Sequence, residues 1–248
     1  MTVGHHFEQV APMYESLRTT DQATVQKIRE LLPDRPVIGL DVGCGTGRYS
    51  KPLSALLPEG SLLLASDLSA GMLAELCASN GHAGLAPVRS TAEELPIRDG
   101  SLDLVTSFNA VHHFDIDRFF ATVARVLRPG GQMFVYTRTQ EQNARTVWGQ
   151  WFPGFTEHEQ RLYSEASLRS AVARTPGLKL AGTHSFHYAR SSTPERLRAQ
   201  AEGHHYSTFS LYSPDELTRA IDSFLARLPN EEVDWVDEYL LVVARREG

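Results

Sequence analysis

Three features of secreted, membrane-bound or nucleic-acid-binding proteins are scarce in this sequence. Cysteine is the first, because only Cys44 and Cys77 occur among 248 residues; this argues against a disulfide framework and fits a reducing compartment. Long apolar runs are the second, since no stretch approaches the roughly 20 residues of a membrane span. The first ten residues also lack the charged and apolar blocks of a signal peptide. These absences predict a cytoplasmic protein with no membrane partner.

Positive charge is the third scarce feature. Lysine and arginine number 24 against 30 aspartate and glutamate residues, which gives a formal net charge of −6 at pH 7. Because phosphate binding depends on clustered cationic side chains, we expect no nucleic-acid partner. The length suits one α/β domain over residues 1–248 with a substantial core and a small lid.

The most informative stretch is VIGLDVGCGTGRYS, residues 37–50. Its first apolar residues predict a strand buried on both faces, with Asp41 at the strand's C-terminal end. Three glycines then alternate with other residues and predict a turn in which a ligand lies against the backbone. A helix from residue 46 or 47 to about 57 is expected to follow, with its free N–H groups facing the same crevice. The three glycines are Gly43, Gly45 and Gly47.

A second strand, residues 62–66, ends at Asp67. In a doubly wound fold, an acidic residue at the end of the second strand binds the ribose hydroxyls of a nucleoside. The alternative is that Asp67 caps the helix that begins near residue 70. Leu68 and Met72 follow this strand as apolar residues.

The next two strands are predicted at residues 85–89 and 102–108, and the second ends at Phe108. The fourth strand lies beside the first, so the residues after it border the pocket at the topological switch point. His112 and His113 fall there, and an imidazole can take a proton from a substrate. The alternative is that they serve packing. Adjacent histidines diverge on a helix, and no other spacing predicts a metal site.

Four segments together resemble the class I S-adenosylmethionine (SAM)-dependent methyltransferases of the small-molecule type, including those of ubiquinone and menaquinone biosynthesis. The resemblance implies a Rossmann-like α/β fold with a seven-stranded, mostly parallel sheet in the order 3-2-1-4-5-7-6 and an antiparallel strand seven. It also implies SAM as cofactor and S-adenosylhomocysteine as product. The segments are FEQVAPMYESLR (7–18), DVGCGTG (41–47), STAEELPIRDGSLDLV (90–105) and LRPGG (127–131).

The resemblance also implies roles for individual residues. Tyr14 and Arg18 are expected to fold over the cofactor, with Arg18 at its methionine carboxylate. Thr91 stands where the family has an adenine-binding aspartate, so we expect its hydroxyl and the backbone N–H of Ala92 to bind adenine. The remaining cofactor-binding residues expected on this basis are Asp41, Gly43, Gly45, Gly47, Asp67, Leu68, Met72 and Phe108.

Beyond residue 138 the sequence is less generic. An insertion at 189–229 resembles that of trans-aconitate methyltransferases and implies an α-helical cap built from residues 1–32 and 189–229. An aromatic group at residues 148–155 either seals the sheet edge or lines a substrate pocket. A polar cluster at 203–208, which includes His205, either contacts substrate or is an exposed loop.

The predicted function is therefore transfer of a methyl group from SAM to a small molecule. If the acceptor needs a base, the candidates are His112, Tyr14 and His205. Three alternatives stay open, namely a methyltransferase acting on RNA or protein, a non-catalytic SAM-binding protein, and an NAD-dependent oxidoreductase. The last would need a glycine later in the turn.

Overall fold

The protein alternates strands and helices, and its computed structural model describes residues 20–78, 84–229 and 231–248. Seven strands form its sheet. The strands are β1 (Ile38–Val42), β2 (Leu62–Asp67), β3 (Leu85–Arg89), β4 (Leu102–Phe108), β5 (Leu127–Thr137), β6 (Leu178–Ser192) and β7 (Val233–Arg246). The α-helices are α2 (Gln22–Leu31), α3 (Ser50–Leu56), α4 (Ala70–Ala78), α5 (Ile116–Val126), α6 (Gln140–Ala144), α7 (Val147–Trp151), α8 (Phe155–His158), α9 (Glu165–Arg174), α10 (Pro194–Glu202) and α11 (Pro214–Leu225), with short 3₁₀ helices η1 (Val111–His113) and η2 (Ser207–Leu211).

The strand order is β3-β2-β1-β4-β5-β7-β6. Pairs among β1 to β5 are parallel, whereas β7 runs antiparallel to both β5 and β6. This arrangement confirms the predicted seven-stranded class I architecture. Across the part of the chain that is described, no helix combines the length and apolar character needed to cross a bilayer.

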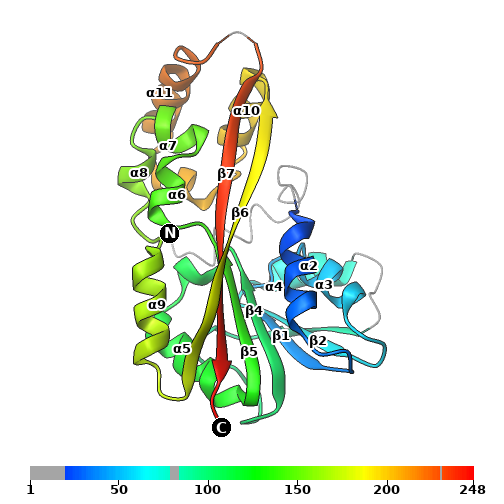
Figure 1. The fold of residues 1–248 in the computed structure, drawn as a ribbon. Coiled ribbons are helices and arrows are strands. Elements are labelled where there is room, and N and C mark those ends of the chain that lie inside the picture. The colour runs from blue at the N-terminus through cyan, green and yellow to red at the C-terminus, as the bar shows by residue number, and fades with distance from the viewer. Residues whose placement is uncertain (1–19, 79–83, 230) are drawn as a thin grey trace.

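Two apolar layers cover the faces of the sheet. Phe119 and Phe120 of α5 pack with Leu168 of α9 on one face. Val25 and Ile28 of α2 pack with other buried side chains on the opposite face. Figure 1 shows α5 and α9 along one side of the sheet and α2 and α3 along the other. The sheet is therefore covered on both faces, as its continuous apolar strands require.

Several element boundaries differ from those predicted. Helix α3 begins at Ser50 and not at residue 46 or 47, because Gly47 has a left-handed φ of +81° and cannot continue a helix. Strand β5 begins at Leu127, which pairs with Leu102 ahead of a register shift. Strands β6 and β7 are the longest of the sheet, with 15 and 14 residues, and they pair from Leu178↔Arg246 to Ser192↔Val233.

The distal half of the β6–β7 hairpin projects beyond the sheet and carries the cap (Figure 1). Its core joins two chain segments: Trp148, Phe152 and Phe155 from the first pack against apolar residues of 197–233 from the second. The expectation for the cap included residues 1–32. Of these, helix α2 packs on α3 and the sheet, and residues 1–19 lie outside the described residues. Most of the aromatic group at 148–155 thus forms the core of the cap, which neither alternative had anticipated, while Trp148 also lines a cavity, as the pocket alternative predicted.

Candidate functional site

The glycine turn is held against the end of β2 by its own backbone. The N–H groups of Gly43 and Cys44 both donate to the carbonyl oxygen of Ser66, at 2.8 and 2.9 Å. The Gly45 N–H donates to Oδ2 of Asp67 at 2.8 Å. Strands β1 and β2 therefore fix the turn at their shared C-terminal edge, where ligands bind in open α/β sheets.

Two glycines of this turn face different surroundings. A Cβ built on Gly45 meets no described atom within 4 Å, whereas one on Gly47 would lie 2.3 Å from Cδ1 of Leu76. Both residues have a positive φ, which favours glycine. Gly45 lines the cavity described below. The open space over Gly45 leaves the backbone accessible to a ligand, while Gly47 serves the packing of α4.

Asp67 holds the turn and remains available to a ligand. Its Oδ1 accepts the N–H of Ser69 at 2.9 Å, and its Oδ2 accepts that of Gly45. Ser69 caps α4 through its own hydroxyl, which accepts the N–H of Met72 at 3.2 Å. Each Asp67 oxygen therefore keeps a lone pair for a further donor. Burial raises the pKa of Asp67, while the hydrogen bonds from Ser69 and Gly45 counteract part of that rise.

Asp41 is an interior anchor. It is almost fully buried and accepts hydrogen bonds from the hydroxyls of Ser50 at 2.5 Å and Thr106 at 2.9 Å. These bonds connect β1 to the first residue of α3 and to β4. Burial raises the pKa of Asp41 to about 7 despite both hydrogen bonds. This carboxyl group is thus poised between its two protonation states near neutral pH.

The expected adenine-binding residues form another wall. Met72 and Ala92 are buried, and the Thr91 hydroxyl accepts the N–H of Glu94 at 3.2 Å. Leu68 is 52% exposed and presents an apolar surface to the cavity. All four of these cavity-lining residues, Leu68, Met72, Thr91 and Ala92, lie near the ends of β2 and β3.

The end of β4 places aromatic and histidine rings beside the turn. Phe108 stacks on Tyr49, with ring centroids 4.5 Å apart and planes 6° apart. His112 and His113 lie in η1, and their ring centroids are 4.1 Å apart. The expectation that adjacent histidines diverge was wrong, because the two rings are in contact within this 3₁₀ turn. His205 lines the same cavity from the cap.

A single cavity of about 570 Å³ joins the glycine turn to the cap. Its volume falls in the range of small-molecule sites. Its floor contains Gly43, Gly45, Asp67, Thr91 and Phe108. Its other side is lined by cap and hairpin residues, which include Trp148, Glu159, Arg190, Arg196, His205, Tyr206, Trp235 and Asp237.

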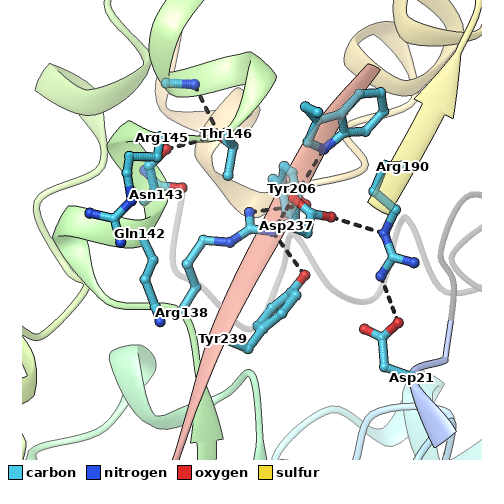
Figure 2. A network of polar contacts seen from close by, with 12 residues as sticks. Asp21, Arg138, Gln142, Asn143, Arg145, Thr146, Arg190, Tyr206, Asp237 and Tyr239 are labelled. Atoms are coloured by element: carbon cyan, nitrogen blue, oxygen red, sulfur yellow. Dashed lines mark hydrogen bonds and ion pairs between the residues drawn. The ribbon is translucent and has the colours of Figure 1, made fainter. Parts of the chain in front are cut away.

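A buried ionic network stands where the cavity passes from the sheet to the cap (Figure 2). Arg138, the residue after β5, donates to Asp237 at 2.8 Å, to Tyr239 at 2.9 Å and to Tyr206 at 3.1 Å. Arg190 of β6 donates to the other oxygen of Asp237 at 3.2 Å. The network therefore connects β5 and both strands of the hairpin to the cap loop.

The same network reaches the start of α2. Arg190 donates to Asp21 at 2.6 Å (Figure 2). Two arginines thus face two aspartates, Asp21 and Asp237, so this set of charges is neutral. The sequence analysis missed Arg138, Arg190 and Asp237. Arg138 directly follows a predicted strand, and its position at the C-terminal edge of the sheet was a usable signal.

A second carboxylate, Glu159, fixes the cap loop. It is 5% exposed and pairs with Arg161, whose Nε donates to it at 2.9 Å. The Thr208 hydroxyl donates to it at 2.6 Å. Burial opposes ionisation, but the hydrogen bonds from Arg161 and Thr208 lower the pKa of Glu159 below its usual value. Glu159 is therefore a paired carboxylate that orders residues 203–208.

Tyr14 and Arg18 lie outside the described residues. Of the remaining predicted residues, Gly47 packs on Leu76 and the others line the cavity. Within the described ranges, no group of three or more His, Cys, Asp and Glu side chains has the arrangement of a metal site.

Comparison with known proteins gives this geometry a context. Residues 40–135, which extend from β1 to β5, match the family model described as "Methyltransferase domain". The malonyl-[acyl-carrier protein] O-methyltransferase of Dechloromonas aromatica is 36% identical over 130 residues, which are 52% of this chain and 47% of that protein. The chain therefore matches about half the length of this relative.

Another relative and a solved structure extend beyond the matched domain. The ubiquinone biosynthesis O-methyltransferase of Rhizobium etli is 29% identical over 190 residues, which are 71% of this chain and 73% of that protein. The structure of geranyl diphosphate C-methyltransferase from Streptomyces coelicolor, solved with S-adenosylhomocysteine, aligns with a TM-score of 0.58 at 16% identity. The alignment covers 91% of this chain and 76% of that one, and it shows a shared fold.

Proposed function

We propose that this chain, whose residues 40–135 match the methyltransferase domain, transfers a methyl group from SAM to a small-molecule acceptor. The observation that carries the proposal is the continuous cavity that joins the glycine turn to the cap. A cofactor on the floor and an acceptor against the cap would meet inside one continuous space. The net charge of −6 favours a small acceptor over a nucleic acid.

The residues present fit the cofactor. The space over Gly45 is open, so a ligand can lie against the backbone there, and a side chain at this position would fill that space. Asp67 keeps acceptor capacity for two ribose hydroxyls. Thr91 and Ala92 would bind adenine between Leu68 and Met72. Asp41 would position the turn and attract the amino group, and Tyr14 and Arg18 remain predicted to cover the methionine portion.

The chain's contribution to the chemistry is mainly alignment. Bound SAM supplies an electrophilic methyl group on a sulfonium whose thioether is a good leaving group. The turn, Asp67 and the adenine wall would fix the cofactor's orientation, and the cap would fix the acceptor. Holding two reactants in line supplies much of the rate in such reactions.

Proton removal is needed only if the acceptor is protonated. The two curated relatives compared above are named O-methyltransferases, which supports an oxygen acceptor. His112 and His205 line the cavity from opposite sides and are the proposed bases for a hydroxyl proton, with Tyr14 a further candidate. A carboxylate acceptor would need no base.

Calorimetric titration of the full chain with SAM, S-adenosylhomocysteine and NAD tests the cofactor assignment. We expect micromolar dissociation constants for the first two and no heat of binding for NAD. Binding of NAD alone would overturn the proposal. Radiolabelled methyl transfer to pooled small hydroxy and carboxylic acids, with tRNA and a protein extract as parallel acceptors, tests the acceptor class. Transfer confined to tRNA or protein would refute a small-molecule acceptor.

A further inference from the structure

Helix α10 presents a polar stripe to the cap side of the cavity. Thr193, Arg196 and Gln200 are spaced three and four residues apart and therefore lie on one face of the helix. All three line the cavity. Leu197 and Ala201 lie on another face and are fully buried in the core of the cap. The cap core therefore fixes which face of α10 the cavity meets.

Arg196 is the charged member of this face. No carboxylate of the described residues lies within 4.0 Å of its guanidinium group. By contrast, Arg198 on the same helix pairs with Glu202 at 3.5 Å and with Asp222 at 3.6 Å. The helix thus carries one arginine paired on the surface and one that faces the cavity.

The other arginines around this part of the cavity are neutralised within the chain. Arg138 and Arg190 face Asp237 and Asp21. Arg161 likewise pairs with Glu159. Among the described residues at the acceptor end, Arg196 is therefore the arginine whose charge is left for a ligand.

Two carboxylates in this region, Glu232 and Glu195, have other contacts. Glu232 also lines the cavity, but it is exposed and accepts a hydrogen bond from the Ser191 hydroxyl at 3.1 Å. Glu195 lies at the N-terminus of α10, where hydrogen bonds from its own N–H and from the Thr193 hydroxyl lower its pKa. Neither carboxylate pairs with Arg196. The Glu195 carboxylate already accepts hydrogen bonds at the N-terminus of α10.

The Ser192 hydroxyl is buried and lies two residues before α10 begins at Pro194. Ser192 is only 6% exposed and lines the cavity. Its Oγ has no hydrogen-bond partner among the described residues. Buried polar groups are nearly always satisfied, so a hydroxyl in this state calls for a missing partner. A ligand in the cavity would provide one.

We propose that the methyl acceptor carries an anionic oxygen group, a carboxylate or a phosphate, that binds Arg196 and Ser192. Both residues offer hydrogen-bond donors, and the guanidinium fork matches the geometry of either oxyanion. This inference rests on the proposed methyltransferase function and adds the chemical class of the acceptor. It also orients the acceptor, because the anionic end lies at α10 and the remainder extends toward the glycine turn.

The test compares Arg196→Gln with Arg198→Gln, a matched change on the same helix. Each full-length protein is first saturated with S-adenosylhomocysteine, and thermal unfolding confirms that both variants fold. Succinate, inorganic phosphate and the neutral succinamide are then titrated and followed by ligand-observed NMR. We expect succinate or phosphate to bind wild type and Arg198→Gln equally and Arg196→Gln about tenfold more weakly. We expect Ser192→Ala to weaken the same anion by a smaller factor.

The outcomes separate the two proposals. Whichever anion binds more tightly identifies the group as carboxylate or phosphate. Equal anion binding in Arg196→Gln and wild type overturns the inference, as does binding of succinamide with the affinity of succinate or no binding of either anion. In each of these cases, intact binding of S-adenosylhomocysteine leaves the proposed function standing. Failure of wild type to bind S-adenosylhomocysteine refutes the proposed function, and the anion site falls with it.

Discussion

Alanine at Gly45 and at Gly47 should separate cofactor binding from folding. Both residues have a positive φ, +56° and +81°, so either alanine costs roughly 1–2 kcal/mol in backbone strain. At Gly47 the new Cβ would also lie 2.3 Å from Cδ1 of Leu76, and such overpacking costs about a further 1–3 kcal/mol. At Gly45 the new methyl group enters the open space of the cavity, where no described atom lies within 4 Å.

Urea unfolding of the two variants measures the first difference. We expect Gly47→Ala to lose about 2–5 kcal/mol of unfolding free energy and Gly45→Ala only about 1–2 kcal/mol. Calorimetry with S-adenosylhomocysteine measures the second difference, and we expect Gly45→Ala to bind at least tenfold more weakly than wild type. Wild-type affinity in Gly45→Ala would show that the cofactor does not lie against this turn. Equal stability of the two variants would refute the role assigned to Leu76.

Three further predictions concern carboxylates and their partners. Asp67→Asn keeps one acceptor oxygen but loses the charge that holds the Gly45 N–H; calorimetry should show roughly tenfold weaker S-adenosylhomocysteine binding, and unchanged affinity would remove Asp67 from the site. Burial raises the pKa of Asp41 from 3.8 to about 7, so the folded protein holds a proton that the unfolded chain releases, and stability must fall as the pH rises through that window. The fall from this group is up to about 4 kcal/mol, and urea unfolding of Asp41→Asn across the same pH range should lack it; an identical slope would contradict the assignment. Arg138→Met leaves the Asp237 carboxylate buried with only part of its pairing and should cost about 3–5 kcal/mol, whereas Arg145→Met, which breaks an exposed pair with Glu238, should cost less than about 1 kcal/mol by the same assay; equal losses would contradict the difference in burial.

Much of the cofactor half of the fold could be predicted because its signals are local. The apolar run before Asp41, the glycine turn and the acidic end of β2 each depend on neighbouring residues, and they predicted β1, β2 and the crevice between them. The strand order was given by family resemblance and was confirmed by the pairing of β7 between β5 and β6.

The acceptor half depends on contacts between distant segments. Trp148 is buried by residues 197–233, and Arg190 pairs with Asp21 across a sequence separation of 169 residues. No local period reveals such partners, so the aromatic group was assigned to a sheet edge or a pocket and the arginines were overlooked. The histidine pair shows a further limit, since the contact between the rings of His112 and His113 depends on side-chain torsion angles that the sequence pattern does not reveal.

The pairing of Ser192 with Val233 at the tip of the hairpin has a consequence for how such an enzyme can diversify. Residues 193–232 connect the paired ends of β6 and β7. The entropy of closing such a connection changes only slowly with its length, so residues can be added or removed there without altering the register of the sheet. The connection, however, packs against Trp148 and Phe152, which lie in the segment between β5 and β6. Substitutions that reshape the acceptor wall must therefore arise in both segments together, while the cofactor crevice at the opposite end of the cavity stays unchanged.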